Sequence, residues 1–158
     1  MKEEVKQLNH ENIDEITSLR IDLQNYDKKY FKEDDIIINQ EQLKKNTEVF
    51  LKKNLNKNLF LFGYYTNNTL VSICGLYLER HFPTYINANG KIAYICNVYT
   101  KPEYRKKGYQ RNVFEYCLAY AKENKIKQFQ LDSKNEIAIK FYKEYGFKEV
   151  DNAYYLSI

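Results

Sequence analysis

The chain has 158 residues, a formal net charge of +4 and 44% hydrophobic residues. These values are typical of one globular domain and exclude wholesale disorder. No apolar run approaches the roughly 18–20 residues of a membrane-spanning helix, and the charged residues 1–4 lead into no apolar segment of a signal peptide. We therefore predict a single domain over residues 1–158 with no membrane partner.

The numbers and spacing of the cysteines and histidines further narrow the class of protein. Cys74, Cys96 and Cys117 are odd in number and far apart, so they do not form a disulfide framework. Free thiols are typical of a reducing cytoplasm, which is the compartment we expect. The two histidines, His10 and His81, have no metal-binding spacing, and we predict no metal site.

The first part of the chain predicts a strand and two helices. Residues 3–8 have a strand-like pattern. Asn12 is suited to cap a helix, and Glu15 would complete a capping box. Apolar residues at helical spacing then predict a helix over 12–26, and a second over 39–54.

The spacing of the apolar residues changes from a helical to a strand-like pattern at residue 59. Residues 59–66 and 70–78 are apolar and rich in residues that favour strands. Asn67 and Asn68 between them favour a tight turn, because asparagine tolerates positive φ. Together these segments predict a β-hairpin, followed by a loop over 81–90.

Residues 91–100 predict a further strand with no clearly polar face, which is typical of a central position in a sheet. Strict alternation would place the side chains on two faces: Ile92, Tyr94, Cys96, Val98 and Thr100 on one, and Ala93, Ile95, Asn97 and Tyr99 on the other.

The last third predicts two more helices. Pro102 ends the preceding strand, and Gly146 is a candidate helix C-cap. The expected elements are a helix over 107–124, a strand over 127–132, a helix over 136–145 and strands over 147–150 and 152–158. This order predicts an α+β fold with one β-α-β unit in its second half.

The excess positive charge is local. Residues 101–111 contain five basic side chains and one acidic, a net charge of +4 in a chain whose total is also +4. Backbone N–H groups at a helix start bind anions, and Gly108 allows an anion to approach closely. P-loop and Rossmann glycine patterns are absent, and an ordinary basic surface turn is the alternative. Because the excess positive charge is confined to residues 101–111, it argues against a protein that coats nucleic acid.

Two motifs in this region resemble the GNAT-type N-acetyltransferases. Residues 105–110 resemble the signature [RQ]-x-x-G-x-[GA], matching at Arg105 and Gly108 and departing at Gln110, where a small residue is usual. Residues 135–147 resemble the family's N-x-x-A-x-x-[FL]-Y-x-x-x-G-F segment. The two motifs are one helix and one strand apart, as that fold requires.

The resemblance implies an α+β fold with α/β/α layers. Its central sheet would be mixed, mostly antiparallel and of about six to seven strands. The neighbouring strands over 91–100 and 127–132 would splay apart and admit the pantetheine arm of acetyl-CoA, the co-substrate.

The resemblance also implies a coenzyme site. Backbone amides over 106–111 would bind the pyrophosphate, with Arg105 and Lys107 as auxiliary cations. Strand residues 97–100 would pair with the pantetheine arm, and an N–H near Val98 would polarise the thioester carbonyl. The implied coenzyme-binding residues are Val98, Tyr99, Thr100, Arg105, Lys106, Lys107, Gly108, Tyr109, Gln110, Arg111 and Asn135.

Two of these residues have alternatives. The long side chain of Gln110, placed beside the pyrophosphate, would either shift the loop or point outward. Asn135 would contact the coenzyme arm, or cap a helix, or do both.

Tyr142 is the catalytic residue that the resemblance implies, as the general acid for the coenzyme A thiolate. The alternative is one more packed aromatic ring among 16 tyrosines. No general base is readable, because the strand over 91–100 has no carboxylate. Glu79 and His81 are candidates, although an exposed strand end explains them equally, and an amine that arrives neutral needs no base. Cys96 fits a buried apolar position better than a covalent role.

The leading function is therefore transfer of an acetyl group from acetyl-CoA to a primary amine, of a small molecule or a peptide, by direct attack. A non-catalytic acyl-CoA-binding or sensing domain on the same fold is the alternative, and a nucleic-acid-binding module is a third. The resemblance also implies that the acceptor lies against residues 24–40 and 80–90. The acidic residues 33–35 favour a cationic amine as the acceptor. The alternative is that they are only the solvated end of a helix. Homodimers are common among such proteins.

Overall fold

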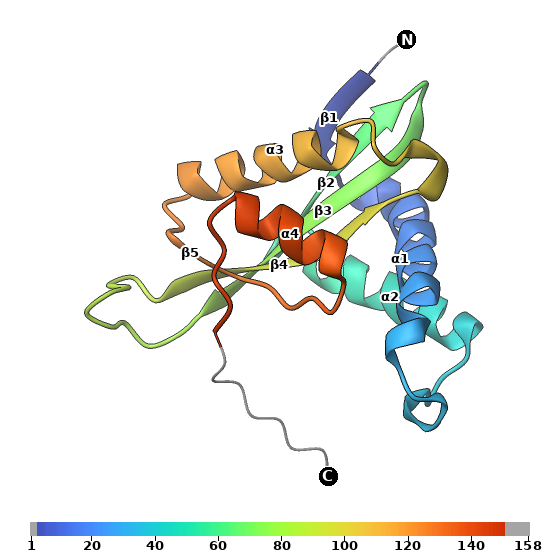
Figure 1. The fold of residues 1–158 in the computed structure, drawn as a ribbon, viewed down its shortest axis with the longest axis horizontal. Coiled ribbons are helices and arrows are strands. Elements are labelled where there is room, and N and C mark those ends of the chain that lie inside the picture. The colour runs from blue at the N-terminus through green and yellow to red at the C-terminus, as the bar shows by residue number, and fades with distance from the viewer. Residues whose placement is uncertain (1–2, 151–158) are drawn as a thin grey trace.

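The computed structural model describes residues 3–150, which form a five-stranded sheet with α-helices on both faces (Figure 1). The strands are β1 (Glu3–Gln7), β2 (Leu59–Thr66), β3 (Thr69–Arg80), β4 (Lys91–Thr100) and β5 (Gln128–Gln130). The α-helices are α1 (Ile13–Asp27), α2 (Gln40–Asn54), α3 (Tyr109–Glu123) and α4 (Glu136–Glu144). The predicted elements up to residue 146 are all present.

The sheet has the order β1-β2-β3-β4-β5, antiparallel except for the parallel pair β4–β5. A mixed, mostly antiparallel sheet is thus confirmed, but the expected six to seven strands are too many for residues 3–150. Residues 147–150 form no strand. Only Phe147 packs on the core, and an otherwise exposed segment has no buried face to fix its register. The strand expected over 152–158 lies outside the described residues.

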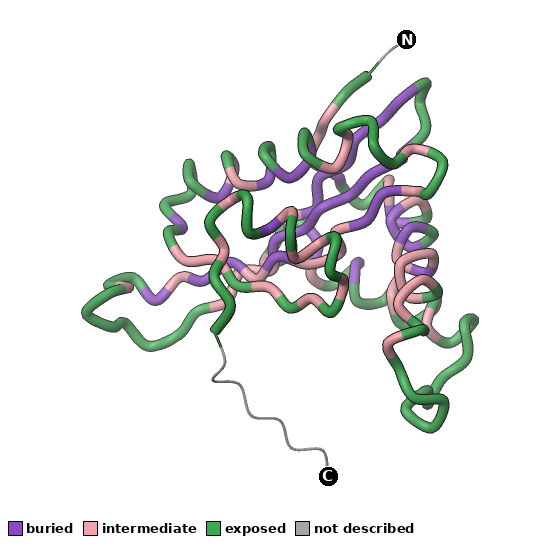
Figure 2. The backbone as a smooth tube through the Cα atoms, in the orientation of Figure 1, coloured by how far each residue is buried: buried purple, intermediate pink, exposed green. Residues whose placement is uncertain are grey.

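Two hydrophobic cores, one on each face, give the α/β/α layers. One core contains Phe62, Phe114 and Tyr142, and joins the sheet to α3 and α4. The other contains Leu19 and Leu51, and joins it to α1 and α2. Burial is concentrated on the strands and the inner helix faces, whereas the loops are exposed (Figure 2).

Local asparagine chemistry sets several boundaries. Asn67 and Asn68 both have positive φ, at 49° and 62°, so the predicted tight turn is confirmed. Asn12 is at the N-cap position of α1, as expected, but its side chain makes no cap hydrogen bond, so the expected capping box with Glu15 is absent. Asn9 starts a short 3-10 turn instead: its Oδ1 accepts from the Glu11 amide at 2.8 Å, and its own amide donates to Asn12 Oδ1 at 3.0 Å.

A β-bulge interrupts β4. Ile73 of β3 pairs with Tyr99, but Gly75 pairs with Cys96, so β4 has one extra residue in this interval. Asn97 takes up the bend with φ 53°. The strict alternation predicted for this strand is therefore wrong. Val98 packs with the α3–α4 core and Tyr99 with the α1–α2 core, the reverse of the expected faces.

The parallel partner of β4 is short. β5 pairs with Ile92, Ala93 and Tyr94 only, and the pairing ends there. From Ile95 onward β4 has no paired strand on that side within residues 3–150. This is the separation of strands predicted from the family resemblance. It leaves the bulge and Val98 on an open strand edge.

Candidate functional site

The turn that leads into α3 carries a row of unused backbone donors. None of the six amides of residues 106–111 donates a hydrogen bond within residues 3–150, and the first helical bond runs from the Asn112 amide to Gly108 O at 3.1 Å. Lys106 and Gly108 are left-handed, with φ of 63° and 81°, which bends the backbone away from helical pairing until Tyr109. Six consecutive free N–H groups at the start of a 15-residue helix suit a diphosphate.

Gln110 points into the sheet. Its Oε1 accepts from Thr100 Oγ1 at 2.9 Å and from Ser72 Oγ at 3.2 Å, and its Nε2 donates to Ile73 O at 3.4 Å. The expectation that this side chain shifts the loop or points outward is therefore wrong. Ser72 and Thr100 are buried, and Gln110 supplies an acceptor for both hydroxyls, although Ser72 also lies 3.3 Å from Tyr99 O. Only its amide is left for an anion.

Tyr109 likewise directs its side chain away from the turn. Its ring stacks on Tyr64 with centroids 4.3 Å apart, and its hydroxyl donates to Glu3 Oε1 at 3.1 Å. The side chain thus ties the start of α3 to β1 and β2. The amide of Tyr109 remains among the six free donors.

The basic side chains divide into two groups. Arg105 donates from Nε to Thr100 O at 3.0 Å and lies over the Tyr26 ring, and Arg111 pairs with Glu144 at 2.7 Å. Lys106 has no side-chain partner within residues 3–150. Lys107 lies 5.3 Å from the Tyr104 ring centroid. The two lysines are exposed and the two arginines are engaged in the fold.

Tyr142 lies in the core between the sheet, α3 and α4. Its ring packs against Phe114 and Phe147, and its hydroxyl makes no hydrogen bond within the described part of the chain. Burial raises the pKa of this phenol, and Cys74 and Tyr94 add to the effect. Tyr142 is therefore a neutral donor whose hydrogen is not committed to another protein group.

Asn135 caps α4, with Oδ1 accepting from the amides of Ile137 and Ala138 at 3.0 and 3.3 Å. Its Nδ2 donates to Tyr26 OH at 3.2 Å. The capping alternative is thus confirmed. The same side chain joins the end of α1 to the start of α4, next to the β5 segment.

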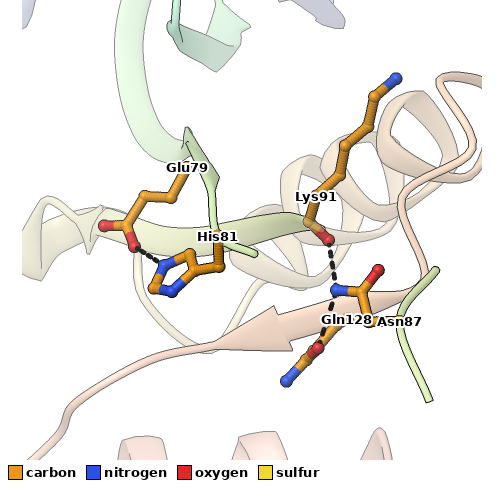
Figure 3. A network of polar contacts seen from close by, with 5 residues as sticks. All are labelled: Glu79, His81, Asn87, Lys91 and Gln128. Carbon is orange, nitrogen blue, oxygen red and sulfur yellow. Dashed lines mark hydrogen bonds and ion pairs between the residues drawn. The ribbon is translucent and has the colours of Figure 1, made fainter. Parts of the chain in front are cut away.

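The candidate bases are remote from the bulge. His81 Nε2 and Glu79 Oε2 are 3.0 Å apart, with 54% and 38% of their side chains exposed (Figure 3). Glu79 pairs with Ile92, four residues along β3 from Gly75, so it lies roughly 13 Å from the bulge. Nearby, Asn87 donates to Lys91 O and to Gln128 Oε1 at 3.0 and 2.9 Å. This cluster holds the 81–90 loop, and the exposed-strand-end interpretation fits it.

The cysteines are packed as apolar residues. All three are unpaired, and burial raises the pKa of the Cys96 thiol to about 12. Burial also raises the pKa of Cys74. Both are therefore thiols at neutral pH and are poor nucleophiles.

Arg20 is a further residue of this site that was not predicted from the sequence. It follows Ile16 by four residues and precedes Leu23 by three, so it lies on the face of α1 that packs on the sheet. Its Nη1 donates to Asn97 Oδ1 at 3.4 Å, directly at the bulge. Burial lowers the pKa of this guanidinium, against the opposing effects of Cys96, Asp27 and Tyr94. A charged residue inside an apolar helical stripe was the available signal.

Residues 3–150 contain neither a membrane-spanning helix nor a cluster of metal-binding side chains. No helix there is both long and apolar enough to cross a membrane. No three side chains of the metal-binding types come together there.

The fold is thus a layered α+β fold whose mixed sheet has an open strand edge beside a helix start that presents free amides. The family model described as "Acetyltransferase (GNAT) family" matches residues 20–147, which is most of the chain. The chain therefore belongs to the GNAT acetyltransferase family.

Solved structures agree with this assignment. A predicted acetyltransferase from Clostridium acetobutylicum, solved with acetyl-CoA, is 25% identical with a TM-score of 0.81, over 99% of this chain and 96% of that one. A GCN5-related N-acetyltransferase from Ralstonia eutropha shares the fold at 15% identity and a TM-score of 0.80, over 99% of both chains. An aminoglycoside acetyltransferase from an uncultured soil sample shares it at 16% and 0.69, over 99% and 96%. No curated protein sequence matches significantly.

Proposed function

We propose that this protein transfers an acetyl group from acetyl-CoA to a primary amine of a small molecule or a peptide by direct attack. The observation that carries the proposal is the set of six free amides over residues 106–111 beside the open edge of β4. These donors fit a diphosphate, and the open edge fits an extended amide-containing arm. Acetyl-CoA, when bound, supplies an activated thioester.

The chain's own groups then orient and stabilise the reaction. Backbone N–H groups of residues 106–111 hold the anionic end of the coenzyme, with Lys106 and Lys107 adding exposed positive charge. The backbone at Asn97 and Val98, where the bulge re-aims β4, is suited to polarise a carbonyl.

Tyr142 acts on the departing sulfur. An ordinary thiol has a pKa of about 8.5 and an ordinary phenol about 10. Because burial raises the pKa of Tyr142 further, complete proton transfer to a thiolate is uphill. The phenol therefore stabilises the developing charge as a hydrogen-bond donor, and solvent supplies the proton in the end.

No side chain is assigned as a general base. β4 has no carboxylate, and Glu79 and His81 lie too far along β3 from the bulge. The acceptor amine then reacts from its neutral fraction and releases its proton to water. Activity should accordingly rise with pH as the acceptor deprotonates.

The test is release of free thiol from acetyl-CoA with a broad panel of amines, together with calorimetric titration of coenzyme A. Binding plus amine-dependent thiol release supports the proposal. Binding without turnover on any amine would instead support the non-catalytic acyl-CoA sensor. Gln110 does not favour that alternative, because its side chain is bonded to Thr100 and points away from the free amides.

A further inference from the structure

A half-buried guanidinium lies at the proposed reaction centre without an ionic partner. Arg20 extends from α1 to Asn97, the left-handed residue of the β4 bulge, and bonds its Oδ1 at 3.4 Å. No carboxylate oxygen in residues 3–150 lies within 4.0 Å of an Arg20 nitrogen. Asp27, the acidic residue that acts on it, is seven residues on, about 10 Å along the helix.

The donors of Arg20 are largely unused. A guanidinium has five N–H donors in a planar fork, and here the protein accepts from Nη1 by one long bond. Withdrawing such a group from water without pairing it costs free energy. A helix that needed only packing at this position would carry another apolar residue, as at Ile16 and Leu19. An anionic ligand would use the remaining donors.

Asp27, the acidic residue that acts on Arg20, is about 10 Å away along α1 and so competes only weakly with such a ligand. Cys96 next to Asn97 is a neutral thiol because burial raises its pKa to about 12. Tyr94, two residues before it, donates to Asp132 at 2.9 Å, which places that carboxylate beyond the phenol. A carboxylate docked here would meet Arg20 as its cationic partner.

We propose that Arg20 binds the carboxylate of the acceptor, and that the acceptor is an α-amino acid. This inference rests on the proposed acetyl transfer, because that reaction brings the attacking amine to the bulge at Asn97 and Val98. Arg20 donates to the side chain of Asn97, which lies at the bulge where the amine would attack. The anionic group bound by Arg20 and the attacking amine must therefore be only a few covalent bonds apart in the acceptor. An α-amino acid satisfies this spacing, and its carboxylate matches the guanidinium fork.

The same charge disfavours polycationic acceptors. A compound with several ammonium groups would place one of them against Arg20, and like charges at short range in a half-buried site repel. The acidic residues at 33–35 do not offset this, because all three are exposed. The aminoglycoside acetyltransferase that shares the fold therefore does not predict the acceptor of this chain.

The experiment compares matched acceptors. Several L-amino acids, the corresponding amino-acid amides and the corresponding decarboxylated amines are assayed by thiol release from acetyl-CoA. The amide is the stringent comparison, because its amine is less basic and is more neutral at the assay pH. We expect the free acids to have the higher kcat/KM in spite of this.

Two variants assign the preference to one residue. Arg20→Gln should lower kcat/KM for the free acids by about tenfold to a hundredfold, the range for a charge-assisted hydrogen-bonded pair, and should change the amides little. Lys122→Gln removes an exposed positive charge in the last turn of α3, outside the coenzyme and acceptor regions, and should leave both values unchanged. Arg20→Lys keeps the positive charge but loses the planar fork of donors. Its kcat/KM for the free acids should lie between those of the unchanged protein and Arg20→Gln.

Binding provides the second readout. Titration of the same amino acids into the protein saturated with coenzyme A should show carboxylate-dependent binding that Arg20→Gln removes, while coenzyme affinity is unchanged. Equal losses for acids and amides in Arg20→Gln, or no carboxylate preference in the unchanged protein, would overturn the role of Arg20. Carboxylate-dependent binding without thiol release would instead refute acetyl transfer and retain the Arg20 site.

Discussion

Replacing Gly108 should weaken coenzyme A binding through the backbone alone. Gly108 has φ 81° and ψ −3°, and a Cβ added there would meet no atom within 4 Å. A substitution therefore causes no clash, and its whole effect is conformational. A non-glycine residue in the left-handed region costs about 1–2 kcal/mol, and a β-branched residue tolerates it least.

The size of the effect follows from the six free amides. Alanine can stay left-handed at that cost, so Gly108→Ala should weaken coenzyme A binding by about thirtyfold at most. Valine should drive the turn out of this conformation and misdirect the amides of residues 108 and 109. Each amide bond to a charged group contributes about 1.5–3 kcal/mol, so Gly108→Val should cost about a hundredfold or more. Lys107→Ala, at an exposed and salt-screened position, should have a much smaller effect.

Calorimetric titration with coenzyme A measures these differences, and Gly146→Ala is the matched control. Gly146 has φ 86°, also with open space around its Cβ position, but it caps α4. Gly146→Ala should lower the melting temperature about as much as Gly108→Ala does, without weakening the binding of coenzyme A. A loss of affinity in Gly146→Ala equal to that in Gly108→Ala would refute the amide site. So would a loss in Lys107→Ala equal to that in Gly108→Val.

Three further predictions concern side chains. Tyr142→Phe should lower kcat by at least about tenfold while leaving coenzyme affinity and melting temperature nearly unchanged, because its hydroxyl has no partner in the described chain; an unchanged kcat would show that the phenol only packs. Gln110→Ala should lower the free energy of unfolding by about 1–3 kcal/mol in a denaturant titration, because Ser72 and Thr100 lose an acceptor, and it should not improve coenzyme binding. Cys96 has a folded pKa raised from about 9 to about 12, so it stabilises the fold fully below pH 9 and less as pH rises toward 12. Cys96→Ser should therefore reduce the alkaline slope of unfolding free energy by up to about 1.4 kcal/mol per pH unit, and an unchanged slope would contradict the burial of the thiol.

The elements were predictable where a local signal exists. Helical and strand periods located every α-helix and strand between residues 3 and 146, and the asparagine pair at 67 and 68 located the hairpin turn. The bulge in β4 was not predictable in this way, because it depends on the register between β3 and β4 and not on residues 91–100 alone. Asn97 carried a weak signal, since asparagine tolerates positive φ, but the chain contains many asparagines.

The candidate site was predictable as backbone and not as side chains. The motif around Gly108 identified the free amides, because glycine at a helix start has a direct conformational meaning. The directions of Gln110 and Tyr109 depend on partners far away in the sequence, namely Ser72 and Tyr64. Such pairings exist only after the sheet has formed, and no spacing within the motif encodes them.

The local charge of +4 has a different meaning once its members are placed. Arg111 is neutralised by Glu144, and Arg105 is held on Thr100 O and over the Tyr26 ring. Arg111 thus holds the turn to α4 and Arg105 holds it to α1, so both arginines mainly stabilise the conformation of the turn. Only lysines at the turn remain as mobile charge, and exposed ammonium groups are weak and screened. Affinity for an anion must therefore come chiefly from the fixed amides of residues 106–111, which the arginines keep in place.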